Sequence, residues 1–514
     1  MFNRIRQEKR FQYAIWGTIL AGILAHGFMM TNKISFHDDI ATLFDIGMTW
    51  KAGRWTLGII EFILSSTVGK YSMPFWEIWV SLCLLSLTAV LIVDLLDIKK
   101  GWCCFLIGAI LAVFPVTAVI YMFMFTAGSY FLGLFLAVWG VWLAERYKFG
   151  WIGTIICTAL MLGVYQAFIC TEITLIICLL ITKCLEDSKE GGIVYAAVKY
   201  MLVEVIGLLC YYQIVKITLR FTGNHLTGYQ GINSMMKLAI KDRLKRVSLC
   251  YTDLLRMFYG DVHGLTGNVI IHLFLICIVI LVLVLIINKL LQINKIFNKI
   301  TYILLILALP IGINLIYPMT TDETAISAIV RYSLVWIWII SMLFVQLCDE
   351  EGKENIAWKK LISKPIIVCC AGSILYYAYL DNSVYMKANF LQEQTTSYFT
   401  TLITQIKSCD EYKDELPVLY VGNWEINDST LTVQNEKYQN TQLTLFSYDL
   451  REWVNNNSYQ AYMSYHCGFS PSIVNIDDVY DWEKIDEMPT YPDYGSIKVI
   501  DGMVVVKFAE RVRE

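Results

Sequence analysis

Charged residues are scarce in this 514-residue sequence, since Asp, Glu, Lys and Arg make up 17% of it, against about 25% in soluble globular domains. Hydrophobic residues make up 57%, and the mean hydropathy is +0.54. They cluster in runs such as 270–287, long enough to cross a hydrocarbon core of about 30 Å. These features exclude a purely soluble protein and predict a polytopic membrane protein.

Excess charge and metal-binding cysteine motifs are also absent. The net charge of −3 argues against a nucleic-acid partner. None of the fifteen cysteines forms a CxxC pair or a Cys/His spacing typical of a metal site. No cofactor is expected, and whether a metal is required is left open. Cys409 and Cys467 alone lie in a polar region, and whether they form a disulfide is left open.

The hydrophobic runs predict about eleven transmembrane helices. The first follows Arg4, Arg6, Lys9 and Arg10 and lacks a small-residue cleavage pattern, so we read it as a membrane span with a cytoplasmic N-terminus. The expected spans are 11–30, 75–96, 102–122, 128–144, 151–164, 167–181, 198–219, 269–287, 302–317, 332–347 and 365–380. Each predicted inner segment carries at least two basic residues, as the positive-inside rule requires. The basic outer loop 220–267 is the exception.

The C-terminal part of the sequence, 381–514, has a different composition from the membrane part, 1–380. Its residues 389–407 have a helical amphipathic pattern, 417–421 reads as a buried strand, and 496–508 reads as a hairpin turned by Asp501-Gly502. An odd number of spans places this small α/β domain outside the cytoplasm. The absence of an internal repeat weighs against an inverted-repeat transporter.

Two adjacent carboxylates, Asp38 and Asp39, follow His37 in the first outer loop, 33–74. Such a pair at the membrane surface can deprotonate a hydroxyl or bind a cation. The alternative is a solvated helix start, because Asp caps helices. Arg54 and Trp55 follow in an interfacial stretch, where Arg suits a phosphate and Trp suits a sugar face; simple interfacial anchoring is the alternative.

The series HDD at 37–39, GRW at 53–55, Pro115, Tyr165-Gln166-Ala167 and Arg331 resembles the bacterial type II glucosyl transferases that modify O-antigens and other surface polysaccharides. The resemblance implies a GT-C type glycosyltransferase of the bacterial cytoplasmic membrane. It implies a polyprenyl-phosphate sugar donor, a surface-polysaccharide acceptor and an outer-face active site. The catalytic base would then be Asp38 or Asp39. The absence of a Rossmann GxGxxG and of a P-loop agrees with a lipid-linked donor.

The negative phosphate leaving group of such a donor calls for cations nearby. The candidates for binding it are Arg331, Arg54, Lys241, Arg243, Lys245 and Arg246. Their alternative role is binding of anionic lipid headgroups. The candidates for binding the sugar or acceptor are His37, Trp55, Tyr165 and Gln166, although a Tyr-Gln turn also satisfies backbone groups at a helix end. Direct displacement predicts inversion at the anomeric carbon.

Other polar residues carry less weight. Glu172 and Glu204 lie in predicted spans, where ionisable groups are costly and often functional, but Glu204 has Lys199 as a potential partner. His26 is expected to be a packing residue. Asp322 and Glu323 belong either to the outer cavity or to a solvated loop. The aromatic residues of the C-terminal part are expected either to contact an acceptor glycan or to form a core. These residues are Trp424, Trp453, Tyr459, Tyr462 and Trp482.

The leading hypothesis is therefore transfer of a hexose, with glucose as the first candidate, to a cell-envelope polysaccharide. A transporter or flippase of a lipid-linked sugar is a second hypothesis, which calls for ionisable or broken-helix positions near mid-membrane. A polysaccharide polymerase or ligase is a third. The polar residues crowd the predicted outer boundary, which favours an outward-facing enzyme over the transporter.

Overall fold

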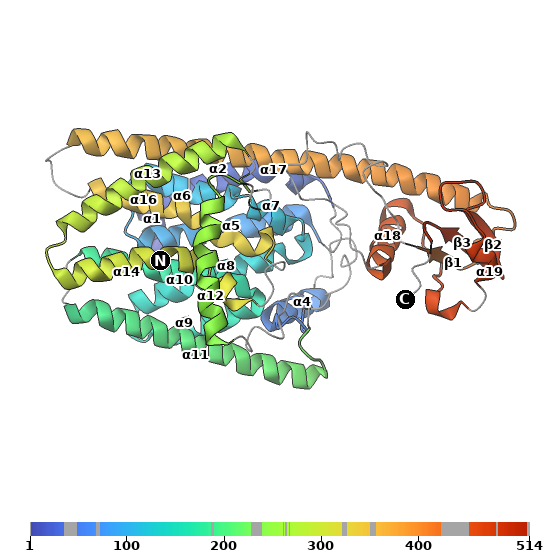
Figure 1. Cartoon of the computed structure of the whole chain (residues 1–514), viewed down its shortest axis with the longest axis horizontal. Coiled ribbons are helices and arrows are strands. Elements are labelled where there is room, and N and C mark those ends of the chain that lie inside the picture. The colour runs from blue at the N-terminus through green and yellow to red at the C-terminus, as the bar shows by residue number, and fades with distance from the viewer. Residues whose placement is uncertain are drawn as a thin grey trace. The chain divides into compact units, whose positions relative to one another are not determined.

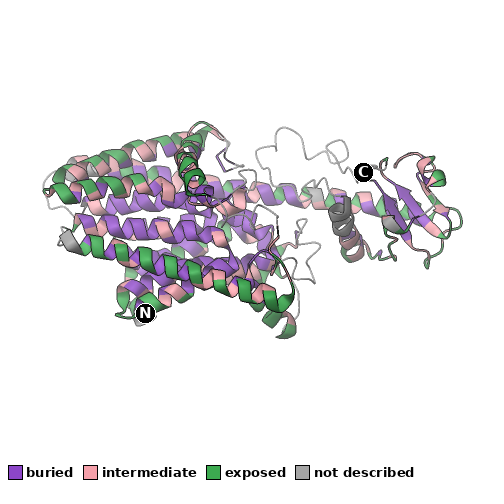
Figure 2. Ribbon diagram, turned by 60° about the horizontal axis from the view of Figure 1, so that its bottom comes forward, coloured by how far each residue is buried: buried purple, intermediate pink, exposed green. Residues whose placement is uncertain are grey.

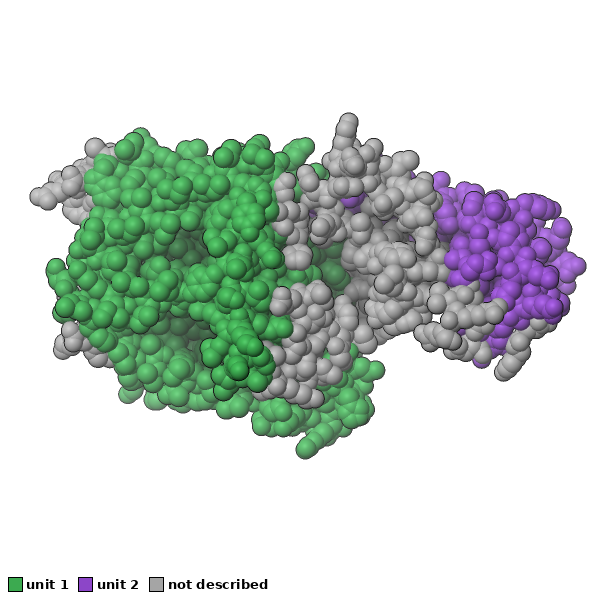
Figure 3. Space-filling view, viewed as in Figure 1, with its two compact units in different colours: residues 1–33, 46–383 green, residues 34–45, 384–514 purple. Residues whose placement is uncertain are grey.

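The computed structural model describes residues 2–34, 49–67, 72–186, 190–227, 239–260, 262, 265–266, 268–320, 326–349, 356–422, 452–479 and 482–510. Helices dominate the described residues (Figure 1). The chain forms two compact units, residues 1–33 with 46–383 (unit 1) and residues 34–45 with 384–514 (unit 2) (Figure 3).

Unit 1 is a bundle of apolar helices. Its elements are α1 (Phe2–Gln7), α2 (Lys9–Thr31), α4 (Trp55–Thr67), α5 (Pro74–Leu95), α6 (Gly101–Val113), α7 (Val116–Tyr121), α8 (Met124–Arg146), α9 (Gly150–Val164), η1 (Gln166–Phe168), α10 (Ile169–Leu185), α11 (Glu190–Thr222), α12 (Ile240–Arg256), α13 (Val269–Gln292), α14 (Ile296–Ile313), α15 (Ile316–Met319), η3 (Ala328–Val335), α16 (Trp336–Asp349) and α17 (Ile356–Lys407), which continues into unit 2.

Nine helices in the described part of the chain are long and apolar enough to cross a membrane. The protein is therefore a multi-pass membrane protein, and the predicted helical membrane fold is confirmed. Two of the eleven expected spans match shorter helices, α6 and α9. The span expected at 102–122 is interrupted because Pro115 lacks an N–H and its ring clashes with the preceding turn, so α6 ends at Val113 and α7 begins at Val116.

Close backbone contacts hold the bundle interior together. A Cβ atom on Gly17 of α2 would lie 2.1 Å from the carbonyl oxygen of Phe105 of α6, and one on Gly108 of α6 would lie 2.1 Å from that of Ala14. Small residues allow membrane helices to approach in this way. Buried residues fill the interior of the bundle and exposed residues cover its outer faces (Figure 2). The exposed side chains of α2 include Trp16, Leu20 and Leu24, as expected for a lipid-facing surface.

One end of the bundle carries a buried acidic side chain surrounded by arginines. The carboxylate of Asp94 accepts hydrogen bonds from Arg4 Nη2 at 2.9 Å and from the indole Nε1 of Trp142 at 2.8 Å. Arg146 Nη2 and Arg10 Nη2 lie 2.8 and 3.5 Å from its carboxylate oxygens. These basic residues come from two predicted inner segments of the sequence, the N-terminal one and the one at 146–148, so the structure brings those segments to the same end.

Unit 2 contains a small mixed sheet. The strands β1 (Val418–Val421), β2 (Ile497–Ile500) and β3 (Met503–Lys507) lie in the order β1-β3-β2, with β1 parallel and β2 antiparallel to β3. Asp501 and Gly502, with φ of 50° and 80°, turn the β2–β3 hairpin as predicted. The remaining elements are α18 (Glu452–Cys467), η6 (Ile476–Asp478) and α19 (Glu483–Asp486).

The core of unit 2 lies between this sheet and α19. Leu419 and Val505 from the strands pack with Ile485 and Met488, and all four are almost fully buried. Cys409 and Cys467 are both free thiols in the structure, so the disulfide that the sequence left open is not formed.

Candidate active site

The predicted catalytic carboxylates lie outside the described residues. Asp38 and Asp39, together with His37, belong to the segment between Ile34 and Thr49, and Asp322 and Glu323 belong to the segment between Thr320 and Ile326. Their catalytic or binding roles therefore stay predictions. The described residues that continue the first loop begin at Thr49 and lead directly into the GRW sequence.

The GRW sequence forms a tight turn that needs glycine. The Gly53 N–H donates to the Trp50 carbonyl oxygen at 3.1 Å, and the Arg54 N–H donates to that of Thr49 at 3.1 Å. Gly53 has a φ of +71°, and a Cβ there would lie 2.8 Å from the Tyr211 hydroxyl oxygen. An L-residue with a side chain is strained at this φ. The turn places Arg54 immediately before α4.

Arg54 is a half-buried cation held against aromatic rings. Its Nη1 donates to the Tyr130 hydroxyl oxygen at 3.0 Å, and its Cζ lies 4.9 Å from the centroid of the Tyr165 ring. The Tyr130 and Tyr165 rings stack with their centroids 4.6 Å apart. The negative faces of aromatic rings attract a guanidinium, so the rings fix the position of the Arg54 charge.

Gln166 fixes the backbone that carries Arg54. Its Nε2 donates to the Ala52 carbonyl oxygen at 3.0 Å and to the Tyr211 hydroxyl oxygen at 2.9 Å. The Tyr211 hydroxyl in turn donates to the Gly53 carbonyl oxygen at 3.2 Å. Tyr165 and Gln166, predicted as sugar-binding residues, thus support the Arg54 turn.

Trp55 lies beneath this turn. The residue is 8% exposed, and a Cβ on Gly163 at the end of α9 would lie 2.7 Å from the indole Cε2 and Nε1 of Trp55. Most of the ring therefore faces α9, and little of it is open to a sugar. The sugar-stacking role of Trp55 stays a prediction.

Arg331 lies in η3 and forms a buried ion pair that the sequence reasoning missed. Its Nη1 donates to both carboxylate oxygens of Asp253, at 2.7 and 2.6 Å, and its Nη2 donates to the Tyr317 hydroxyl oxygen at 2.7 Å. The Tyr317 hydroxyl also donates to Asp253 at 2.8 Å. Arg331 is 4% exposed and Asp253 is 2% exposed, so the Arg331 charge is compensated inside the protein.

The predicted basic cluster on α12 is divided between two faces of the helix. Lys241 and Lys245 are exposed, whereas Arg243 and Arg246 are half-buried. Arg243 Nη1 donates to the Pro318 carbonyl oxygen at 3.1 Å. Lys245 lies 3.9 Å from the carboxylate of Asp242, which is also exposed. The two lysines are therefore the cations of this cluster that are open to a ligand or a lipid headgroup.

A chain of aromatic contacts connects the two arginine sites. The Tyr165 ring lies edge-on to Phe168 of η1 with centroids 5.6 Å apart, and Phe168 lies edge-on to Tyr332 at 6.4 Å. Tyr332 directly follows Arg331 in η3. The turn around Arg54 and the start of α16 are therefore parts of one packed region of unit 1.

The family model described as Glucosyl transferase GtrII matches residues 27–343. The chain belongs to this family. The match covers Arg54, α12 and Arg331, as well as the segment containing Asp38 and Asp39, and it confirms the resemblance drawn from the sequence. No curated protein and no solved structure matches the chain. Membership makes the protein a membrane glycosyltransferase, with a sugar donor and an acceptor as substrates.

Glu172 and Glu204, two buried carboxylates of this GtrII-family chain, interact with each other, and Glu204 does not pair with Lys199. Lys199 Nζ donates to the Ala144 carbonyl oxygen at 3.0 Å, so it is not the partner that the sequence offered to Glu204. Glu172 accepts from the Thr158 hydroxyl at 2.9 Å and interacts electrostatically with Glu204. Among the described residues, no hydrogen-bond partner reaches the carboxylate oxygens of Glu204.

His26 behaves as the predicted packing residue. Its Nε2 is hydrogen-bonded to the Ala112 carbonyl oxygen at 2.8 Å, and its ring lies edge-on to Tyr121 at 4.9 Å. The carboxylate of Asp381 lies 3.9 Å from the same nitrogen. Among the described residues, no group of three or more His, Cys, Asp or Glu side chains is arranged to hold a metal ion.

The tail aromatics that the structure describes are core residues. The Tyr462 ring is buried, and its hydroxyl donates to the Gln392 carbonyl oxygen at 3.0 Å. Trp482 is half-buried against the sheet core. Trp424 and the side chains of Trp453 and Tyr459 lie outside the described part of the chain.

The sequence reasoning did not identify four residues that contact the site residues: Tyr130, Tyr211, Asp253 and Tyr317. Three of them are tyrosines in or beside apolar runs, where a tyrosine cannot be distinguished from the other hydrophobic residues of a membrane span. Asp253 does carry a signal, since it stands on the inward face of the amphipathic helix, three positions after Cys250. A carboxylate on such a face calls for a buried cationic partner.

Proposed function

We propose that this GtrII-family protein transfers a glucosyl residue from polyprenyl phosphate to a cell-surface polysaccharide on the outer face of the bacterial cytoplasmic membrane. The family match carries the glucosyltransferase assignment. The half-buried Arg54, fixed by Tyr130, Tyr165 and Gln166, supports a phosphate-linked donor, because a positioned guanidinium suits a departing phosphate.

The proposed reaction is a single displacement at the anomeric carbon. Asp38 or Asp39 accepts the proton of an acceptor hydroxyl, whose oxygen forms the new bond to that carbon. The bond between the anomeric carbon and the phosphate oxygen breaks at the same time. Polyprenyl phosphate leaves with the electron pair, and Arg54 compensates its negative charge. The product has the inverted anomeric configuration.

The cations divide into two classes under this proposal. We assign binding of the donor phosphate, or of the anionic headgroups around it, to Arg54, Lys241 and Lys245, because their side chains are half-buried or exposed. Arg331 first has to leave Asp253 before it can bind a phosphate. We therefore assign Arg331 a supporting role, in which it holds η3 against α12.

The proposed orientation in the membrane rests on the basic residues at the end of the bundle opposite Arg54. Arg4, Arg10 and Arg146 converge on Asp94 there, and Lys183 forms an ion pair with Glu145 at 2.7 Å. An excess of Lys and Arg at one end of a helical membrane protein favours the cytoplasmic side for that end. This supports an outward-facing position for Arg54 and for the acceptor.

The proposal is tested by linkage analysis of the envelope polysaccharide in the source organism. A deletion is expected to remove one side-branch glucose, and the wild-type gene to restore it. Asp38→Asn or Asp39→Asn and Arg54→Gln are expected not to restore it, whereas Lys51→Gln, an exposed lysine three residues before Arg54, serves as the matched control. An unchanged glycan in the deletion strain would contradict the proposal.

A further inference from the structure

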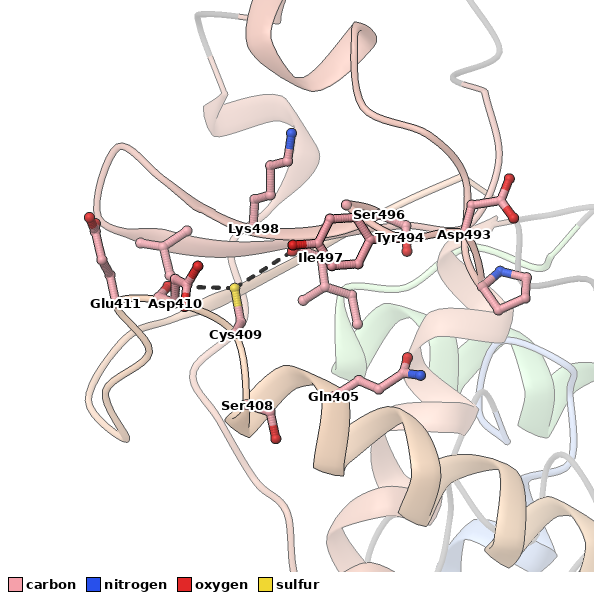
Figure 4. Close-up of a pocket in the computed structure, with 13 residues that line it drawn as sticks. Gln405, Ser408, Cys409, Asp410, Glu411, Asp493, Tyr494, Ser496, Ile497 and Lys498 are labelled. Carbon is pink, nitrogen blue, oxygen red and sulfur yellow. Dashed lines mark hydrogen bonds between the residues drawn. The ribbon is translucent and has the colours of Figure 1, made fainter.

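Unit 2 contains a cavity of about 610 Å³. It lies between the C-terminal end of α17 with the turn that follows it and the loop 492–496 that leads into β2 (Figure 4). Its volume falls within the roughly 300–1,000 Å³ typical of small-molecule sites. The family match ends at residue 343, so it does not cover this part of the chain.

An aromatic ring stands fully exposed at this cavity. Tyr494 is 102% exposed, and backbone hydrogen bonds close the turn that carries it. The Asp493 N–H donates to the Thr490 carbonyl oxygen at 3.0 Å, and the Ser496 N–H donates to that of Asp493 at 3.1 Å. Gly495 follows with a φ of +91°. An open ring offers its face for stacking against the apolar C–H face of a sugar.

The other walls of the cavity are polar. Gln405 comes from α17, Ser408, Asp410 and Glu411 come from the turn after it, and Asp493 comes from the opposite loop (Figure 4). Amide, hydroxyl and carboxylate groups are donors and acceptors suited to sugar hydroxyls. The side chains of Gln405, Asp410 and Asp493 make no hydrogen bond to another described residue, so their polar atoms are available to a ligand.

The charge of the lining selects among ligands. Asp410, Glu411 and Asp493 supply three carboxylates, and Lys498 supplies the single ammonium group among the lining residues. A net negative lining repels phosphates and nucleic acids. A neutral, hydroxyl-rich ligand satisfies both the polar groups and the exposed ring.

The lining of the cavity suits non-covalent binding, because its cysteine is a poor nucleophile. Cys409 is the one cysteine in its described lining, and its Sγ lies 3.6 Å from the Ile497 carbonyl oxygen, which ties the end of α17 to β2. Burial raises the pKa of this thiol, so it stays protonated at neutral pH and is a poor nucleophile. Glu411 has a φ of +67°, an unfavourable backbone conformation that structural context must hold in place.

We propose that this cavity binds a segment of the acceptor polysaccharide, with Tyr494 stacked on one sugar ring and Gln405 and Asp493 bonded to its hydroxyls. The proposal rests on the proposed function, because it takes the acceptor to be a polysaccharide. It gives unit 2 the task of recognising the acceptor while unit 1 holds the lipid-linked donor.

The test uses the full-length protein in nanodiscs and oligosaccharides cut from the unglucosylated polysaccharide of a deletion strain. Wild-type protein is expected to bind them in calorimetry, and Tyr494→Ala to weaken binding about five- to tenfold, the size of one aromatic contact. Tyr494→Phe keeps the ring and is expected to bind as wild type. Tyr465→Ala, a half-exposed tyrosine on α18 outside the cavity, is the matched control.

The same variants separate this proposal from the proposed function. In a transfer assay, Tyr494→Ala is expected to raise KM for the polysaccharide several-fold with little change in kcat, whereas Asp38→Asn or Asp39→Asn removes transfer and leaves oligosaccharide binding intact. Wild-type transfer combined with unchanged binding by Tyr494→Ala and Gln405→Ala would overturn the cavity proposal alone. Oligosaccharide binding that depends on Tyr494, without any transfer by the wild type, would overturn the proposed function alone.

Discussion

Replacing Asp253 by Asn is expected to destabilise unit 1 by about 3 kcal/mol, because it leaves the Arg331 guanidinium buried without its counter-charge. Both side chains are almost fully buried, and Nη1 of Arg331 lies 2.7 and 2.6 Å from the two Asp253 oxygens. Loss of one partner of a buried pair costs about 3–5 kcal/mol. Asn retains an acceptor for Tyr317, which places the effect at the lower end of this range.

The assay is thermal unfolding of the purified protein in nanodiscs, analysed as a double-mutant cycle. Asp253→Asn and Arg331→Met each lower the Tm, whereas the double variant, which buries neither charge, recovers much of the loss. The expected coupling is about 2 kcal/mol. Lys245→Gln, an exposed position on the same helix, is the control and is expected to change stability by less than about 0.5 kcal/mol.

Two results would refute this reasoning. One is an Asp253→Asn variant that melts with the wild type, and the other is a double variant whose loss equals the sum of the single losses. Either result would mean that Arg331 does not depend on Asp253. The arginine would then return to the set of cations open to a donor phosphate.

Three further predictions concern other parts of unit 1. Gly53→Ala is expected to lower the transfer rate about ten- to a hundredfold by displacing Arg54. The control is Gly223→Ala, which has a similar φ of +65° but no neighbour within 4 Å, and it is expected to keep the transfer rate near that of the wild type. Equal effects of the two substitutions would contradict this prediction. Burial raises the pKa of Asp97, but hydrogen bonds from Lys99 and Arg10 outweigh burial, so that its pKa lies below the usual 3.8. Its contribution is therefore present above that pH and is lost as the pH falls through the folded-state pKa. Asp97→Asn should lower the Tm slightly at pH 7, and this difference should disappear once the pH is below the folded-state pKa. A Tm difference independent of pH would argue against the ion pairs. Glu204→Gln is expected to keep the Tm or to raise stability by up to about 1–2 kcal/mol, because it removes one of two interacting buried carboxylates; a clear drop in Tm would reveal a partner for Glu204.

The membrane helices were predictable because their signal is local and long. A run of about twenty apolar residues identifies a span without knowledge of its neighbours, and the Asp501-Gly502 turn is an equally local signal. The lengths of α6 and α9 were less predictable. Pro115 marks the end of α6, but hydropathy continues across it and merges two short helices into one predicted span.

The sequence suggested some residues of the candidate site, but it did not indicate which residues they contact. Arg54, Gln166 and Arg331 were chosen from the sequence, whereas their contacts join elements far apart in the chain. Gln166 reaches back 114 residues to Ala52, and Arg331 reaches back 78 residues to Asp253. Such pairings depend on how the helices pack, and a single sequence carries no record of that.

Transfer by the purified protein is the most direct test of the central claim. The protein is reconstituted in liposomes with radiolabelled polyprenyl-phosphate glucose, and unglucosylated polysaccharide is supplied at the face that exposes Arg54. We predict that the label enters the polysaccharide with inverted anomeric configuration and that Asp38→Asn or Asp39→Asn abolishes this transfer. Movement of the labelled lipid across the bilayer without any label in the polysaccharide would contradict the account.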